Sequence, residues 1–201
     1  LIVYAFFYNL STTFFHFVEF FGAEEAGDLC HEGGVGLAAG RAEQQVGVAV
    51  VLRHVGGVES LRDVTADMLD TYKGEMDEGV YRRCRYVVDE NQRLLDACAA
   101  LEKGDYVTFG QKMNGSHEGL SRQYEVSCDE LDFLADIGHR TDGVLGARMM
   151  GGGFGGCTIN LVRAEAYDGY LAEATDRFAH RFGHAPRVIE VNISQGARRI
   201  G

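Results

Sequence analysis

The fold of this chain is organised around the stretch Arg148-Met149-Met150-Gly151-Gly152-Gly153-Phe154-Gly155-Gly156-Cys157-Thr158, in which five residues are glycine. The stretch lies between two apolar runs, Gly143–Ala147 and Ile159–Val162. Because glycine has no Cβ, its backbone adopts positive φ values and lets another group approach closely. A glycine loop between two strands can therefore offer several backbone N–H groups to an anion, phosphate above all. The alternative is a tight connection in which glycine serves geometry alone.

The composition indicates a globular protein. The chain has 201 residues, of which 46% are hydrophobic and 24% are charged, a length that suits one domain or one and a half. Its net charge of −11 argues against a nucleic-acid partner, which needs a basic face. The five cysteines are scattered and form no CxxC pair, so we expect reduced thiols of a cytoplasmic protein, and neither disulfides nor a zinc site.

Residues 1–40 differ in composition from the rest of the chain. They contain no lysine or arginine, and nine of the 21 Phe and Tyr residues lie within residues 1–21. The uncharged run Leu1–Val18 is shorter than the ~20 apolar residues of a spanning helix and lacks the basic start of a signal peptide. We therefore favour a buried, strand-rich segment that lacks its pairing partners over a membrane segment.

The middle of the chain shows helical periodicity. The predicted helices are Arg41–Val55, Ala66–Met76, Asp77–Lys103, Asp105–Gln123 and Cys128–Ile137. Thr65 is expected to cap the second helix, and the pattern Ser127-x-x-Glu130 predicts a reciprocal capping box at the start of the last one. A lone histidine on a helix, such as His117, is more typical of a structural hydrogen bond than of catalysis.

The last third of the chain predicts a small sheet. Val144–Met149, Cys157–Val162 and Arg187–Ile193 have the patterns of strands, and Glu165–Phe182 has that of an amphipathic helix ended by Gly183. This order predicts an α+β fold, in which an antiparallel sheet is layered with helices on one face.

Three blocks of sequence, taken in order, resemble galactokinases, which belong to the GHMP kinase superfamily. The blocks are Met113–Leu120, Tyr124–Asp132 and Gly146–Thr158. The glycine block alone indicates only the superfamily, whereas Tyr124-Glu125-Val126-Ser127-Cys128 points to galactokinase. The resemblance covers about Arg41–Gly201 and implies the carboxyl-terminal part of the enzyme. The chain then divides into an atypical aromatic and glycine-rich segment at 1–40, divergent or misread, and a GHMP kinase C-terminal region at 41–201, which includes a helical middle.

The resemblance implies ATP-dependent phosphorylation of galactose at its 1-hydroxyl, with Mg²⁺, which opens the Leloir pathway. It places the glycine block near the ATP phosphates, so the candidate phosphate-contacting residues are Gly151, Gly152, Gly153, Phe154, Gly155 and Gly156. The family's galactose signature, its Ser-rich phosphate loop and its proposed catalytic base lie upstream and have no match here. No catalytic residue and no metal ligand is therefore assigned. For the full-length family the resemblance implies a cytoplasmic monomer whose partners are ATP and galactose, with no nucleic acid and no membrane.

Other functions remain open at the level of the sequence. We expect the chain to be inactive as an enzyme on its own. A non-catalytic protein that binds sugar or nucleotide is one alternative, and a kinase for a related sugar such as N-acetylgalactosamine is another. A fragment tethered to a membrane through Leu1–Phe21 is the least favoured.

Overall fold

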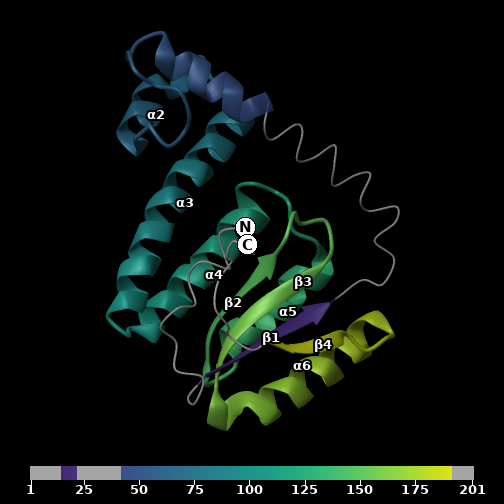
Figure 1. Cartoon of the computed structure of the whole chain (residues 1–201). Helices are drawn as coiled ribbons and strands as arrows, with labels where there is room; N and C mark the ends of the chain where they lie inside the picture. Colours follow the sequence, from purple (N-terminus) through teal and green to yellow (C-terminus); the bar gives the residue numbers. More distant parts are fainter. Residues whose placement is uncertain (1–14, 22–41, 192–201) are drawn as a thin grey trace, which may run out of the picture.

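A four-stranded antiparallel sheet forms one end of the molecule (Figure 1). The computed structural model describes residues 15–21 and 42–191 of the chain. The strands are β1 (Phe15–Phe21), β2 (Val144–Met150), β3 (Cys157–Arg163) and β4 (Arg187–Val191), and their order in the sheet is β2-β3-β1-β4. The three strands predicted from the last third of the chain are present, and the α+β class is confirmed.

Strand β1 comes from the compositionally atypical first forty residues. It lies between β3 and β4, with Phe17 opposite both Leu161 and Val191. The expected strand therefore exists at Phe15–Phe21, but the expectation that it lacks partners was wrong, because both neighbours belong to this chain. The remainder of residues 1–40 lies outside the described residues. None of the described helices is long and apolar enough to cross a membrane.

The helices predicted for the middle of the chain are also present. Residues 42–52 are helical, and they are followed by α2 (Ala66–Tyr72), the short 3-10 helix η2 (Lys73–Glu75), α3 (Glu78–Glu102) and α4 (Tyr106–Arg122). Thr65 caps α2 as predicted, since its hydroxyl accepts a hydrogen bond from Met68 N at 3.2 Å. Asp105 caps α4 in the same way through Thr108 N.

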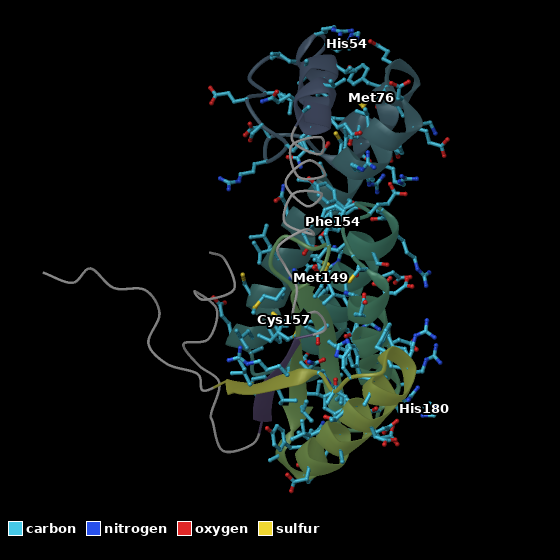
Figure 2. The ribbon with its side chains drawn as sticks, turned by 90° about the vertical axis from the view of Figure 1, so that its right-hand side faces the viewer. His54, Met76, Met149, Phe154, Cys157 and His180 are labelled. Atoms are coloured by element: carbon cyan, nitrogen blue, oxygen red, sulfur yellow. The ribbon has the colours of Figure 1, made fainter. Side chains whose placement is uncertain are left out.

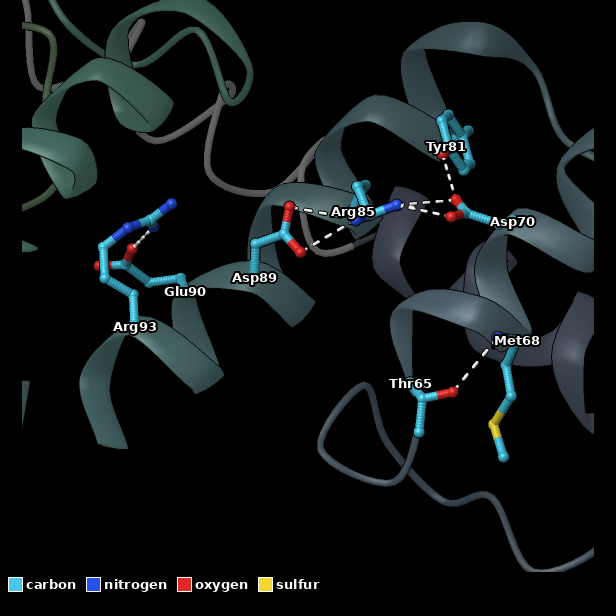
Figure 3. Close-up of polar contacts among 8 residues, drawn as sticks. All are labelled: Thr65, Met68, Asp70, Tyr81, Arg85, Asp89, Glu90 and Arg93. Carbon is cyan, nitrogen blue, oxygen red and sulfur yellow. Dashed lines mark hydrogen bonds and ion pairs between the residues drawn. The ribbon is translucent and has the colours of Figure 1, made fainter. Parts of the chain in front are cut away.

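Residues 42–76 and the first half of α3 form a helical lobe at the far end of α3 from the sheet (Figure 1). Its core is a cluster of buried apolar side chains that includes Val51, Leu61, Leu69 and Cys84. Polar contacts join α2 to α3 at the surface of this lobe: the Arg85 guanidinium donates to both Asp70 and Asp89, and the Tyr81 hydroxyl also donates to Asp70 (Figure 3). The lobe therefore has its own core, separate from that of the sheet.

Helices contact both faces of the sheet. The remaining helices are α5 (Asp129–Arg140), the 3-10 helix η3 (Ala164–Ala166) and α6 (Tyr167–Phe182), which ends at left-handed Gly183 as predicted. Leu161 joins an apolar cluster with residues of α3 and α4, whereas its neighbour Val162 joins a cluster with residues of α5 and α6. Adjacent side chains of a strand point to opposite faces. The prediction that the helices lie on one face alone was therefore wrong for α3 and α4.

The predicted capping box at the start of α5 does not form. Cys128, in an extended conformation, occupies the N-cap position, and no side chain caps the helix. Ser127 lies one residue further out, and its hydroxyl donates to Asp132 Oδ1 at 2.5 Å. A hydrogen bond to an ionised carboxylate is stronger than one between neutral groups, so this contact prevails over the local capping pattern.

Helix α4 packs unusually close to strand β2. A Cβ added to Gly110 would lie 2.0 Å from the carbonyl oxygen of Leu145, and one added to Gly146 would lie 2.7 Å from the Gly110 Cα. Glycine is therefore required at this crossing because the two backbones leave no space for a side chain.

Side chains from α4 and α5 satisfy the outer backbone groups of β2, which is an edge strand of the described sheet. Ala147 N donates to Asn114 Oδ1 at 2.8 Å, and Met149 N donates to His117 Nδ1 at 3.1 Å. His139 Nε2 donates to the Ala147 carbonyl oxygen at 2.8 Å. Exposed edge groups invite pairing with another chain, and here the two helices occupy them.

The bonding of His117 fixes its protonation state. Its Nδ1 accepts from Met149 N and so carries no proton, which leaves Nε2 to donate to Asp132 Oδ1 at 3.2 Å. Burial lowers the pKa of His117 to about 4, although the Asp132 carboxylate opposes this shift. His117 is therefore neutral near pH 7 and acts as a structural hydrogen bonder, as its isolated position on a helix predicted.

Replacing Gly110 by alanine should destabilise the protein. The new Cβ would meet the backbone of β2, so we expect a loss of about 2 kcal/mol or more in the free energy of unfolding, despite the better helix propensity of alanine. Gly169→Ala in α6 is the matched control, because a Cβ there meets nothing within 4 Å, and it should stabilise by about 0.5–1 kcal/mol. Urea unfolding measures both changes, and a neutral Gly110→Ala would contradict the close contact.

Acid should weaken the fold through His117. Because its folded-state pKa of about 4 lies below the ordinary 6.5, the native state binds fewer protons than the unfolded state, and stability is lost as pH falls from 6.5 toward 4. The loss is at most roughly 3 kcal/mol. Urea unfolding between pH 7 and pH 4 measures this effect. The His117→Asn variant should have a lower free energy of unfolding than the parent at pH 7, but that free energy should fall less steeply as the pH is lowered.

The control for this titration is His180→Asn, which removes an exposed histidine of α6. In this control, the free energy of unfolding should fall with decreasing pH as steeply as in the parent. An equally steep decline in His117→Asn would show that another group is responsible.

Candidate functional site

The loop Gly151–Gly156 joins β2 to β3 at the end of the sheet that faces the helical lobe (Figure 1). Figure 2 shows Phe154 between Met149, in the sheet, and Met76, in the lobe. Five of the six loop residues have positive φ, namely Gly151 (98°), Gly153 (87°), Phe154 (59°), Gly155 (126°) and Gly156 (100°). Only glycine adopts such angles without strain, so the sequence of this loop matches its backbone path.

The middle of the loop rests on the connector between α4 and α5, residues 123–128. Phe154 N donates to the carbonyl oxygen of Val126 at 2.7 Å, and a Cβ on Gly153 would lie 2.0 Å from that same oxygen. The Phe154 side chain packs against the buried cluster of Val126, Leu131 and Met149. This hydrogen bond and this burial offset the strain of a left-handed phenylalanine.

The two ends of the loop are open. A Cβ on Gly151 would meet nothing within 4 Å, and one on Gly156 would meet only the Met150 carbonyl oxygen at 3.8 Å. Of the loop's six backbone N–H groups, that of Phe154 alone bonds to another described residue. Successive unbonded N–H groups in left-handed backbone form a concavity that suits an anion. The phosphate-contacting role expected for Gly151–Gly156 stays a prediction, to which this backbone geometry is suited.

The charged side chains near the loop are paired with one another. Glu125 of the connector bonds to Arg82 at 2.6 Å and to Arg83 at 2.8 Å. Arg148, which precedes the loop on β2, lies 3.9 Å from Glu90. Because these arginines already face carboxylates, the groups at this site that suit a phosphate best are the backbone N–H groups of the loop.

The described residues show no metal-binding cluster. Within residues 15–21 and 42–191, no group of three or more His, Cys, Asp or Glu side chains lies together in a way that could hold a metal ion. His117 bonds to Met149, two residues before the loop. Both of its ring nitrogens are engaged in hydrogen bonds, so it has no free atom for acid–base chemistry.

Sequence reasoning identified the loop but missed the residues on which it rests. Val126 supplies its anchoring carbonyl, and His117 fixes Met149 at its base. Both lie within the sequence blocks that carry the resemblance, which was the available signal. Their contacts with the loop depend on the tertiary fold, and residue spacing alone does not predict them.

Known proteins resemble this chain in both sequence and fold. The family described as GHMP kinases C terminal matches residues 97–175. A galactokinase of Clostridium beijerinckii is 35% identical over 162 residues, which are 80% of this chain and 41% of that protein. Human galactokinase is 47% identical over 110 residues, 55% of this chain and 28% of that protein.

A solved structure extends the likeness to the fold. The galactokinase of Lactococcus lactis, complexed with galactose, matches with a TM-score of 0.80 and 27% identity, over 92% of this chain and 47% of that one. The chain thus spans less than half the length of these relatives. Residues 97–175 thus match the GHMP kinase C-terminal family, and by sequence and fold the chain resembles the carboxyl-terminal part of galactokinases.

Proposed function

We propose that residues 41–201 form the carboxyl-terminal part of a galactokinase, a cytoplasmic, monomeric enzyme that transfers the γ-phosphoryl group of ATP to the 1-hydroxyl of galactose. The observation that carries the proposal is the loop Gly151–Gly156, which has positive φ at five of its six residues, is open at both ends and is anchored at its centre. The similarity to galactokinases supports it, and the bound galactose of the Lactococcus lactis enzyme supports this choice of sugar.

The proposed role of the loop is to hold the ATP phosphates. Phosphoryl transfer depends on positioning and charge stabilisation, for which fixed backbone N–H donors are well suited. The Phe154–Val126 hydrogen bond fixes the centre of the loop, so the donors at Gly151, Gly155 and Gly156 need little ordering when an anion binds. The loss of one such donor typically raises a barrier by on the order of 3 kcal/mol. Bound Mg²⁺ would neutralise charge on the phosphates.

The first test of the proposal is nucleotide binding. Titration of the ¹⁵N-labelled chain with MgATP should shift the amide signals of Gly151–Gly156 more than those of the helical lobe. Gly153→Ala should weaken binding by about tenfold or more, which is ~1.4 kcal/mol, because its Cβ would displace the Val126 carbonyl. Gly169→Ala serves as the control and should bind like the parent. An absence of shifts in the loop would count against phosphate binding there.

The second test is catalysis. The purified 201-residue chain should form no galactose 1-phosphate from MgATP and galactose, because the family's galactose signature, Ser-rich phosphate loop and proposed catalytic base have no match in its sequence. Full-length Lactococcus lactis galactokinase, assayed in parallel, is the positive control. Detectable galactose 1-phosphate from this chain would show that the missing chemistry is supplied by its own residues.

A further inference from the structure

The base of the glycine loop is held at two points. Met149, near the end of β2, bonds through its N–H to His117 of α4. Val126 of the connector bonds through its carbonyl oxygen to Phe154 N, in the middle of the loop. These two supports come from different elements, so the shape of the loop depends on how they are held relative to each other.

A single carboxylate, that of Asp132 in the first turns of α5, is linked to both supports through one intervening residue each. Its Oδ1 accepts from Ser127 Oγ at 2.5 Å and from His117 Nε2 at 3.2 Å. Its Oδ2 accepts from Ser121 Oγ at 2.8 Å, near the end of α4. Ser127 directly follows Val126 in the connector, and His117 holds Met149, so Asp132 lies one bonded residue away from each support.

The surroundings of Asp132 differ from those of an ordinary surface aspartate. Asp136, one turn later on α5, is similarly exposed (44% against 45%) and pairs with Arg140 at 2.8 Å. No described lysine or arginine forms an ion pair with Asp132. Its carboxylate is used instead by three donors from α4 and the connector, two hydroxyls and a neutral imidazole. Three charge-assisted hydrogen bonds restrict its geometry far more than one exposed ion pair does.

We propose that Asp132 is a positioning residue for the glycine loop, because its carboxylate fixes the position of the connector relative to the end of β2. It touches no loop atom itself and acts through Ser127 and His117. The consequence for ATP rests on the function proposed above, whereas the consequence for the geometry of the loop does not.

The test in the ligand-free chain is amide hydrogen exchange of Phe154 and Met149, whose N–H groups make the two supporting bonds. Asp132→Ala should speed the exchange of both amides by about tenfold or more relative to the parent. Asp132→Asn should restore most of the protection, since its amide oxygen can still accept from His117 and Ser127. Asp136→Ala, the matched control, should leave both amides unchanged.

Two results would overturn the proposal. Unchanged exchange at Phe154 and Met149 in Asp132→Ala is one. The other is faster exchange spread evenly over α4, α5 and the sheet, which would indicate a merely structural contribution. If Asp132→Ala fails to fold, the Ser127→Ala variant serves as the test. In this variant the amide of Phe154 should exchange faster than in the parent, while the amide of Met149 stays protected. Equal protection of the two amides would contradict the proposed link.

Titration with MgATP then separates this proposal from the proposed function. If the parent binds MgATP, Asp132→Ala should bind about tenfold more weakly and Asp136→Ala should bind like the parent. Parental affinity in Asp132→Ala would overturn the link to nucleotide binding. If the parent itself does not bind MgATP, the proposed role of the loop fails, while the exchange data still decide whether Asp132 positions it.

Discussion

Strand β2 needs partners for its outward backbone groups, and helix α4 supplies them. Asn114 and His117 accept from Ala147 N and Met149 N, and a buried N–H without a partner would cost about 1–3 kcal/mol. The two acceptors share one face of α4 with Gly110, since these positions are four and three residues apart. Gly110 lets the helix come close enough for both side chains to reach the strand. The glycine and the two acceptors are thus parts of a single contact between helix and sheet edge.

The same contact determines where the glycine loop begins. Met149, fixed by His117, is the second residue before Gly151, and the connector that follows α4 supplies the Val126 carbonyl under Phe154. The loop is therefore rigid at its base and centre and open at Gly151 and Gly156. This combination suits the binding of an anion by backbone donors, because the ordering is already present before the ligand arrives.

Local features of the fold could be predicted from the sequence, and features that depend on distant segments could not. The three- and four-residue spacing of Tyr81, Cys84 and Val88 identified α3, and Gly183 marked the end of α6. The pairing of β1 with β3 and β4 joins residues about 140 and 170 positions apart, for which residue spacing carries no signal. The capping-box prediction was wrong for a short-range reason, because the Ser127 hydroxyl bonds to Asp132, five residues later, and does not cap α5. At the candidate site, the loop itself was predicted from its glycines, but the Val126 carbonyl that anchors it was not.

The helical lobe is tied to the loop through the connector. Arg83 of α3 bonds to Glu43, in the helix at 42–52, and to Glu125 in the connector, which Arg82 also contacts. Glu125 has a φ of 60°, a conformation that costs a non-glycine residue roughly 1–2 kcal/mol. Exposed ion pairs contribute little singly, but Arg83 is only 24% exposed and joins two carboxylates from separate segments. This network offsets the strain at Glu125 and holds Val126, the next residue, where Phe154 needs its carbonyl. A lobe that contributes no residue to the loop thereby helps to set the loop's position.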